Sequence, residues 1–381
     1  MLAVRITRNY MMNIFPDMKN SRIGCVIMAS GLGVRFGGNK LMADFGGKPM
    51  VSHILESATA CFTNVVVVTR NTGVVELCNA NNIRVVFHDL PYRSDTIRLG
   101  IEALGGSVDG ACFCLADQPF LSVTLLRKLI AFATEEPNII WRSSSDGVIG
   151  SPAYFPKKYF DELSSLPQDK GGSYVCKKHP ETVKFIDVEN PLELRDIDTR
   201  ETYEELLPLA RNLNFWNDFL KSDKKHLFIT GHRGSGKTTL INRLQPLIGN
   251  GTSGLTSFAV QGIDVRLVNN RTKEEIIIGR YIPDDFVKTN RMTPDISVFD
   301  TKGIAFVEEL IDSNNTWVTI DEIGYLEEFS YKYQEAIRSL LETKRVVAVV
   351  RKDDLNFLNE LINRSDAFVL DLDICGGDFY V

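Results

Sequence analysis

The segment Gly231–Thr238, GHRGSGKT, has the spacing G-x-x-x-x-G-K-[ST] of a loop that binds nucleotide phosphates. The apolar run HLFIT precedes it and the helical pattern TLINRLQPL follows it, which is the order of strand, loop and helix that such a loop requires. Lys237 is expected to neutralise β- and γ-phosphate oxygens, and the Thr238 hydroxyl to hold Mg²⁺. A surface turn of the same spacing is the alternative. The residues predicted to bind nucleotide here are Gly231, His232, Arg233, Gly234, Ser235, Gly236, Lys237, Thr238 and Thr239.

A pair of acids follows the apolar run TWVTI downstream of this loop. Asp321 would stand at the carboxyl end of a strand, where an acid reaches the metal of a nucleotide bound to a P-loop. Glu322 is then the residue expected to orient or activate a hydrolytic water. The loop and the acids together predict nucleotide binding, and hydrolysis depends further on Glu322.

A second glycine-rich loop lies near the start of the chain, in ASGLGVRFGGNK, and follows the apolar run GCVIM. Its glycines come close to the dinucleotide-binding fingerprint, which would indicate an oxidoreductase. However, that fold begins its helix inside the glycine loop, whereas here the chain continues to Pro49 before a helix can open. The next strand, NVVVVT, ends without the expected acid. Arg70 could serve an NADP enzyme, so this strand end alone leaves the oxidoreductase open.

The cations of this first loop favour a triphosphate over a dinucleotide. Arg35 and Lys40 lie among the glycines, and a flexible backbone with two cations suits several phosphates better than one pyrophosphate bridge. In CLADQP, Asp117 follows a buried strand, at the edge where open α/β sheets bind ligands, and an acid there would hold Mg²⁺. A cap or turn residue before Pro119 is the alternative for Asp117. The residues predicted to bind nucleotide here are Ala29, Ser30, Gly31, Gly33, Arg35 and Lys40.

The pattern of elements predicts an α/β protein with two doubly wound, mainly parallel three-layer domains. At 381 residues the chain is too long for one ordinary core. We expect a tail at residues 1–21, a nucleotidyltransferase-like Rossmann domain at 22–208, a connector at 209–224 and a P-loop domain at 225–381. Strands are expected at 24–28, 64–69, 83–87, 110–115, 226–230, 317–320 and 345–350, and helices at 49–60, 94–104, 123–133 and 331–341.

Composition narrows the classes of function. The formal net charge is −6, so no sequence-wide attraction to nucleic acid or an anionic membrane is visible, and no apolar run is long enough to span a bilayer. The seven cysteines are odd in number and lack a paired C-x-x-C arrangement, which favours reduced core thiols in the cytoplasm. Residues 1–21 lack the features of a secretory signal; a loose tail is expected, with a transit peptide as the alternative.

Residues of the second half resemble the THEP-type family of small P-loop nucleoside-triphosphatases. The resemblance lies in ITGHRGSGKTTLINRL, VTIDEIGYLE and FSYKYQEAIRSLLETKRVVAVVRK. It implies slow, base-tolerant hydrolysis of ATP, GTP and similar nucleotides, with Lys237, Thr238, Asp321 and Glu322 in the roles given above. The family's base-binding segment between the motifs is kept only loosely in GLTSFAVQGIDVRLV. Arg351 and Lys352, at the end of the last strand, are expected either to contact phosphate or to be solvated.

Residues of the first half resemble the molybdenum cofactor nucleotidyltransferases (MobA-like), closest to the cytidylyltransferase branch. The matching segments, in order, are MASGLGVRFGGNKL, SDTIRLGIEAL, LADQPFLS, GSPAYFPKKYFDELSSLPQDKGG and RDIDTRETYEEL. The resemblance implies transfer of a nucleoside monophosphate from a triphosphate to molybdopterin, with release of pyrophosphate. Arg35 and Lys40 then serve the triphosphate and Asp117 holds Mg²⁺. Asp198 or Asp196 supplies a second carboxylate, although a helix N-cap is an equal interpretation of either.

The DQP sequence favours CTP, but Ser30 departs from both the two alanines of the cytidylyl branch and the two glycines of the guanylyl branch. CTP or GTP at the first site and ATP or GTP at the second are therefore expected, with molybdopterin as acceptor and a molybdoenzyme or maturation protein as partner. A sugar-1-phosphate nucleotidyltransferase is the alternative for the first half. For the second half, the alternative is a nucleotide-gated switch or metal-insertion chaperone that binds nucleotide but scarcely hydrolyses it.

Overall fold

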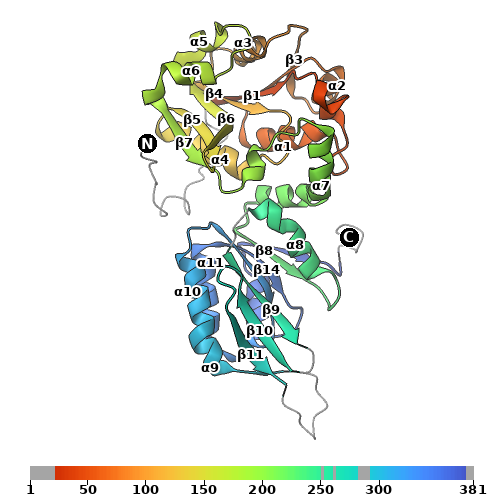
Figure 1. Cartoon of the computed structure of the whole chain (residues 1–381), viewed down its shortest axis with the longest axis vertical. Coiled ribbons are helices and arrows are strands. Elements are labelled where there is room, and N and C mark those ends of the chain that lie inside the picture. The colour runs from red at the N-terminus through yellow and green to blue at the C-terminus, as the bar shows by residue number, and fades with distance from the viewer. Residues whose placement is uncertain (1–21, 250–252, 261–262, 282–291, 375–381) are drawn as a thin grey trace. The chain divides into compact units, whose positions relative to one another are not determined.

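The computed structural model describes residues 22–249, 253–260, 263–281 and 292–374. The chain divides into two compact units, Met1–Leu220 and Lys221–Val381, each built on its own β-sheet (Figure 1). The tail expected at residues 1–21 and Cys375 lie outside the described residues. In the part that is described, none of the helices combines the length and apolar character needed to cross a bilayer.

The sheet of the first unit has the order β3-β2-β1-β4-β6-β5-β7 and is mixed. From β3 to β4 all neighbours are parallel, whereas β6 is antiparallel to both β4 and β5. The four strands expected at the start of the chain are confirmed, and their β-branched residues are mostly buried. The strands are β1 (Ile23–Ala29), β2 (Val65–Thr69), β3 (Arg84–Phe87), β4 (Gly110–Leu115), β5 (Ile140–Ser145), β6 (Val148–Pro156) and β7 (Val183–Asp187).

Helices cover both faces of this sheet, with α3 and α5 on one face and α1 and α4 on the other (Figure 1). The three expected helices are confirmed, although α1 begins at Met50 and Pro49 immediately precedes it. The sequence analysis missed α2, whose amino terminus is capped by the Asn71 side chain. The helices are α1 (Met50–Cys61), α2 (Thr72–Ala80), α3 (Arg93–Leu104), α4 (Val123–Glu135), α5 (Phe160–Ser164), α6 (Ser173–Lys178) and α7 (Arg200–Lys221).

The second sheet has the order β12-β11-β10-β9-β13-β14-β8-β15. From β9 to β15 all neighbours are parallel, and β9 to β12 form an antiparallel extension that the sequence analysis did not find. Strand β14 separates β8 from β13. The strands are β8 (His226–Thr230), β9 (Ser253–Val260), β10 (Asp264–Asn269), β11 (Glu275–Arg280), β12 (Thr293–Pro294), β13 (Trp317–Ile323), β14 (Arg345–Val350) and β15 (Ala367–Asp371).

Helices α10 and α11 pack against each other over one face of this sheet, and α8 covers the opposite face (Figure 1). The core that the sheet forms with α10 and α11 contains large buried side chains, among them Phe228, Phe299 and Phe357. The helix expected at 331–341 is confirmed as α11. The α-helices of the second unit are α8 (Lys237–Ile248), α9 (Ile296–Val298), α10 (Ile304–Asp312), α11 (Tyr331–Thr343) and α12 (Asn356–Ile362). Both units are therefore α/β layers, which confirms the expected fold class, and each mainly parallel sheet also contains antiparallel strands that were not expected.

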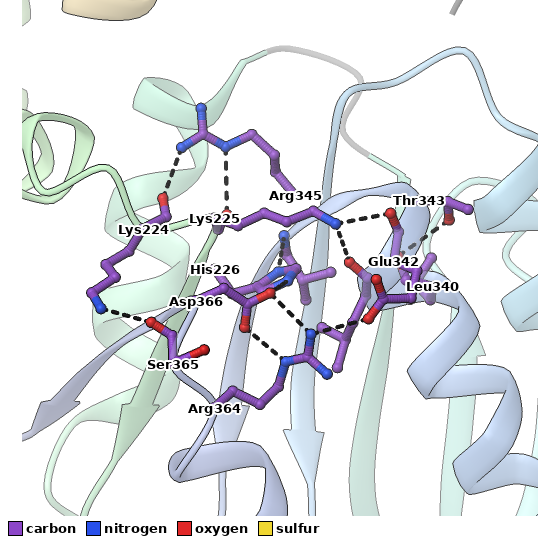
Figure 2. A network of polar contacts seen from close by, with 12 residues as sticks. Lys224, Lys225, His226, Leu340, Glu342, Thr343, Arg345, Arg364, Ser365 and Asp366 are labelled. Atoms are coloured by element: carbon purple, nitrogen blue, oxygen red, sulfur yellow. Dashed lines mark hydrogen bonds and ion pairs between the residues drawn. The ribbon is translucent and has the colours of Figure 1, made fainter. Parts of the chain in front are cut away.

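The chain enters the second unit through Lys224 and Lys225 at the amino-terminal edge of its parallel strands (Figure 2). Arg345, the first residue of β14, donates hydrogen bonds to the carbonyl oxygens of Lys224 and Lys225 at 3.1 and 3.4 Å. Lys224 Nζ donates to the Ser365 carbonyl oxygen at 2.6 Å. The entry point is thus fixed by several elements at once, at the edge opposite the phosphate loop.

His226 lies at the centre of the same network and is fully buried (Figure 2). Its Nδ1 accepts a hydrogen bond from the Val346 backbone N–H at 3.2 Å, which leaves the proton of the neutral ring on Nε2, 3.5 Å from Asp366 Oδ2. Burial lowers the pKa of His226 to about 3. Arg364 donates to both carboxylate oxygens of Asp366 at 2.9 Å, so His226 stays neutral beside an ion pair that is already satisfied.

Candidate functional sites

Four charged side chains of the first unit converge at the carboxyl end of its sheet. Strands β1 and β4 are parallel neighbours, so the glycine loop after β1 and Asp117 after β4 lie at the same edge. Lys40 Nζ is 2.5 Å from Asp117 Oδ2 and 2.9 Å from Asp198 Oδ1, and Arg35 Nη2 is 2.8 Å from Asp198 Oδ2. The structure thus brings together the residues predicted to serve the triphosphate and the metal.

The glycines of the first loop shape it for this arrangement. Gly33 and Gly37 have φ values of 62° and 79° and bracket a single 3-10 turn, Val34–Phe36, that carries Arg35. A Cβ at Gly33 would lie 2.6 Å from the Gly38 carbonyl oxygen, so a larger residue would distort the loop. Beyond it the chain makes a second short turn at Lys40 and reaches α1 only at Met50. The long loop that argued against a dinucleotide fold is confirmed.

Asp198, and not Asp196, is the second acid of this cluster. The alternative role of Asp196 or Asp198 was to cap the amino terminus of the following helix. Thr199 has that role, because its Oγ1 accepts a hydrogen bond from the Thr202 N–H at 3.1 Å. Burial opposes ionisation of Asp198, but the hydrogen bonds and charges of Lys40 and Arg35 together outweigh burial, and the pKa of Asp198 is lowered. For Asp196, desolvation and the nearby Asp117 carboxylate raise the pKa to about 6. Only Asp198 is held as a charged partner of the cations.

Lys40 is the buried member of the cluster, with 6% of its side chain exposed. Burial disfavours its charged form, but the carboxylates of Asp117 and Asp198 outweigh this effect and raise its pKa. Arg35, in contrast, is 73% exposed at the rim. The site therefore holds one buried cation and one exposed cation, both bound to the acids.

Ser30 has a structural partner that the sequence analysis missed. Its hydroxyl donates to the Val68 carbonyl oxygen at 3.1 Å and lies 2.7 Å from His88 Nε2. His88 follows β3, and burial together with the Arg70 charge lowers its pKa. The position of His88 directly after the strand IRVVF could have indicated that it lies at the carboxyl edge of the sheet, near the first loop. The Ser30 hydroxyl thus holds the start of the loop against β2 and β3.

The second predicted loop wraps the amino terminus of α8, which begins at Lys237. Gly231, Gly234 and Gly236 all have positive φ, of 147°, 87° and 92°, so the loop uses conformations that glycine adopts freely. Lys237 is buried, and its Nζ donates to the carbonyl oxygens of Gly231 and His232 at 2.8 and 2.9 Å. Ser235 Oγ is buried and, within the described residues, has no hydrogen-bond partner. Backbone N–H groups at a helix amino terminus and these polar groups suit a phosphate.

Asp321 reaches the same loop from β13. Thr238 Oγ1 donates a hydrogen bond to Asp321 Oδ1 at 3.3 Å, although β14 lies between β8 and β13. Burial raises the pKa of Asp321, the Glu322 charge adds to the effect, and the Thr238 hydroxyl opposes it. The two residues predicted to hold Mg²⁺ are therefore together.

Glu322 is held by the strand that lies between these two motifs. Arg351, just after β14, places Nη1 3.4 Å from Glu322 Oε1 and Nε 3.2 Å from Asp353 Oδ2. Arg351 is therefore not simply solvated, because it contacts two carboxylates. The turn that follows Glu322 is fixed by Glu327, whose buried carboxylate accepts the Gly324 N–H at 2.9 Å. Burial raises the pKa of Glu327 to about 7.

A third acid at the second loop, Asp373, was missed. Its carboxylate accepts the His232 backbone N–H at 3.1 Å and lies 2.6 Å from His232 Nδ1. Lys352 donates to Asp371 at 2.7 Å and to Asp373 at 2.9 Å. Hydrogen bonds from Lys352 and His232 lower the pKa of Asp373 to about 2. The segment AFVLDLD, an apolar run that ends in acids, could have indicated a strand with Asp373 just after it. That this strand pairs with β8 depends on long-range contacts and could not be read from the segment.

Neither site contains a complete set of protein ligands for a metal. In the described part of the chain, no group of three or more His, Cys, Asp or Glu side chains could hold a metal ion. Two carboxylates at the first site, or a hydroxyl and a carboxylate at the second, nevertheless fit Mg²⁺, because this ion is usually bound by one or two protein oxygens together with substrate phosphates and water. The donor chemistry at both loops therefore suits a magnesium–nucleotide complex.

Two family models match the chain in succession. Residues 25–183 match the MobA-like NTP transferase domain, and residues 226–378 match the NTPase family. Nucleoside-triphosphatase THEP1 of Thermotoga maritima is 25% identical over 150 residues, which cover 38% of this chain and 85% of that protein. Purine catabolism protein PucB of Bacillus subtilis is 28% identical over 198 residues, which cover 47% of this chain and 93% of that protein. Both resemblances found in the sequence are confirmed at this level.

Solved structures with similar folds include Rv0371c of Mycobacterium tuberculosis, at 22% identity and a TM-score of 0.44 over 49% of this chain and 97% of that one. THEP1 of Aquifex aeolicus is 22% identical with a TM-score of 0.33, over 39% of this chain and 89% of that one.

Proposed function

We propose, from a chain that joins a MobA-like NTP transferase domain to an NTPase domain, that the two units carry out two separate reactions on nucleoside triphosphates. The first unit transfers a nucleoside monophosphate, with CMP favoured, to the terminal phosphate of molybdopterin and releases pyrophosphate. The second hydrolyses nucleoside triphosphates. The observation that carries the first assignment is the convergence of Arg35 and Lys40 with Asp117 and Asp198. A molybdoenzyme or its maturation protein is the proposed recipient of the product.

In the proposed transfer, an oxygen of the acceptor phosphate attacks the α-phosphorus, and the bond from the α-phosphorus to the pyrophosphate oxygen breaks. Arg35 and Lys40 neutralise the charge that develops on the leaving pyrophosphate. Asp117 and Asp198 would hold Mg²⁺, which supplies further charge neutralisation when bound. The residues chiefly align two phosphates that repel each other, so no side chain needs to act as a covalent nucleophile.

In the proposed hydrolysis, the loop N–H groups and Lys237 bind the β- and γ-phosphates. Glu322 takes a proton from the water that attacks the γ-phosphorus, and the nucleoside diphosphate leaves. Thr238 and Asp321 would hold Mg²⁺. Lys237 must leave the carbonyl oxygens of Gly231 and His232 for the phosphates, so nucleotide binding exchanges one set of its contacts for another.

A nucleotide-gated switch or metal-insertion chaperone is the second candidate for this unit. The observation that favours it is the contact of Arg351 with Glu322 at 3.4 Å, because a carboxylate engaged by a cation is less available to orient the attacking water. Single-turnover hydrolysis compared with nucleotide affinity distinguishes the two. A chain that binds ATP tightly but scarcely hydrolyses it, both before and after Arg351→Gln, acts as a switch. Hydrolysis that becomes faster in that variant supports a hydrolase restrained by Arg351.

The transferase proposal is tested by incubating the purified chain with molybdopterin, Mg²⁺ and each nucleoside triphosphate in turn, and identifying the product by mass. We expect a nucleotide adduct of molybdopterin that forms best with CTP. Sugar 1-phosphates, offered in parallel, test the alternative acceptor class. An adduct with a sugar 1-phosphate but none with molybdopterin would replace the proposed acceptor.

A further inference from the structure

The ammonium group of Lys40 occupies the space between the two acids of the first site. It is bound to Asp117 and Asp198 at 2.5 and 2.9 Å, and only 6% of the side chain is exposed. We propose that Lys40 is a resident cation that keeps a divalent metal out of this site until a nucleoside triphosphate arrives, so that metal and nucleotide bind together. This inference rests on the proposed nucleotide site but not on molybdopterin as the acceptor.

A metal ion alone would find few protein ligands at this site. Two carboxylates leave most positions around Mg²⁺ to water or substrate phosphates, and among the described residues no group of three or more His, Cys, Asp or Glu side chains could hold a metal ion. A metal ion without nucleotide would also have to displace an ammonium that is buried and bound to both acids. A displaced Lys40 would then have lost its partners while still surrounded by protein, which is costly for a charged group. Metal binding without nucleotide is therefore disfavoured.

The charges of the four side chains also favour joint binding of metal and nucleotide. Arg35 and Lys40 offset Asp117 and Asp198, so the four groups together are neutral. A divalent metal alone would add two uncompensated positive charges, and a triphosphate alone would add several negative charges. The charges of the metal and the triphosphate offset each other when both bind. The phosphates can then pair with Arg35 and Lys40, while Asp117 and Asp198 bind the metal. The charges of the site are therefore balanced best when the metal and the triphosphate are bound together.

Arg35 is the cation of the site that is accessible from solvent. Arg35 is 73% exposed and holds the oxygen of Asp198 that Lys40 does not hold. A triphosphate approaching from solvent meets Arg35 first, which frees that oxygen of Asp198 before Lys40 moves. Because binding free energies are reciprocal, nucleotide raises the metal affinity by the same factor by which metal raises the nucleotide affinity.

The test measures Mn²⁺ binding to the full chain without nucleotide, from the electron paramagnetic resonance signal of the free ion. All variants carry Lys237→Ala, which weakens nucleotide binding at the second loop. We expect no tight Mn²⁺ site in this parent and a new site of about one ion per chain after Lys40→Gln. Lys184→Gln is the matched control, since Lys184 forms an ion pair with Glu136 at 2.7 Å outside the cluster and should leave Mn²⁺ binding unchanged.

A second measurement needs no change at Lys40. Calorimetry on the same parent compares binding of a CTP analogue, with a methylene group between the α- and β-phosphorus, in Mg²⁺ and in EDTA. The proposal predicts at least about tenfold tighter binding with Mg²⁺. If the Lys40→Gln variant does not fold, the difference in nucleotide affinity between Mg²⁺ and EDTA tests the proposal by itself.

Two results overturn the proposal: a parent protein that binds Mn²⁺ without nucleotide as tightly as the Lys40→Gln variant, or nucleotide affinity that is the same with and without Mg²⁺. Failure to modify molybdopterin would change neither measurement, so the two proposals fail separately.

Discussion

Lys40 and Asp117, 77 positions apart in the chain, meet with Nζ 2.5 Å from Oδ2 at the shared carboxyl edge of β1 and β4. The contact joins the glycine-rich loop to the acid of the DQP sequence. It exists because parallel neighbouring strands place their ends side by side. The acids of the site are consequently neutralised by Lys40 and Arg35.

Removing the charge of Asp117 tests its proposed role in transfer. Asp117→Asn keeps nearly the same shape but loses an anionic ligand for the metal, so we expect pyrophosphate release to fall by on the order of 100-fold or more. Hydrolysis at the second site should be unchanged. Asp109→Asn is the matched control, because Asp109 is a largely exposed acid that pairs only loosely, at 3.5 Å, with Arg22. Transfer at the wild-type rate in Asp117→Asn would make Asp117 structural.

A comparison of Asp198 with Asp196 tests which of these close neighbours serves the site. Asp198→Asn removes the carboxylate that binds both Arg35 and Lys40, so transfer should fall strongly. Asp196→Asn should remain close to wild type, because Asp196 lies outside this group of ion pairs. Initial rates of pyrophosphate release at saturating nucleotide compare the two variants with the wild type. The reverse order of effects would show that the acids exchange roles when nucleotide binds.

The sequence predicted the parts of each site that are local. A strand followed by glycines and a helix specifies the second loop, and Asp117 and Asp321 could be placed because each directly follows a buried run. The sequence could not decide whether Asp198 binds metal or caps a helix, because that depends on the residue at which α7 begins. In the structure, Thr199 caps α7. Local pattern predicts which residues lie at strand ends but not which of them meet.

Long-range pairing accounts for what was missed. Asp373 reaches His232 only because β15 is a neighbour of β8, and Arg351 reaches Glu322 only because β14 lies between the two nucleotide motifs. The β9–β12 extension was missed for a related reason. Its strands have partly exposed, mixed polar and apolar faces rather than continuous buried runs. Strand order is decided by contacts between distant segments.

The proposed base of the second site is tested by Glu322→Gln. The amide keeps nearly the same shape and can still interact with Arg351, but it cannot accept a proton, so hydrolysis should fall by on the order of 100-fold. Nucleotide affinity should be retained, and the variant should trap the triphosphate. Rapid separation of bound ATP from ADP measures this directly. Unchanged hydrolysis would remove Glu322 from the mechanism.

His226 makes the second unit sensitive to acid. Its pKa is about 3 in the folded chain and about 6.5 when unfolded, so acidification protonates the unfolded state first. The stability that this difference provides is complete above pH 6.5 and is lost as the pH falls towards 3. Between pH 6.5 and 5 the loss is at most about 2 kcal/mol, from 1.5 pH units at about 1.4 kcal/mol each.

His226→Asn separates this effect from packing, because the amide oxygen can still accept the Val346 N–H but does not titrate. Urea unfolding of the second unit at pH 6.5 and 5 should show a smaller acid-induced loss in the variant than in the wild type. An equal loss in both proteins would assign the acid sensitivity to other groups.

The central claim, that the chain has two separate phosphate sites with different chemistry, is tested most directly with CTP that carries distinguishable labels on its α- and γ-phosphorus. With molybdopterin present, the γ label of the wild type should appear in both pyrophosphate and phosphate, and the α label in both the pterin product and CDP. Lys237→Ala should yield only pyrophosphate and the pterin product, whereas Asp117→Asn should yield only phosphate and CDP. Loss of both sets of products together in either well-folded variant would contradict two independent sites and show that one unit controls the other.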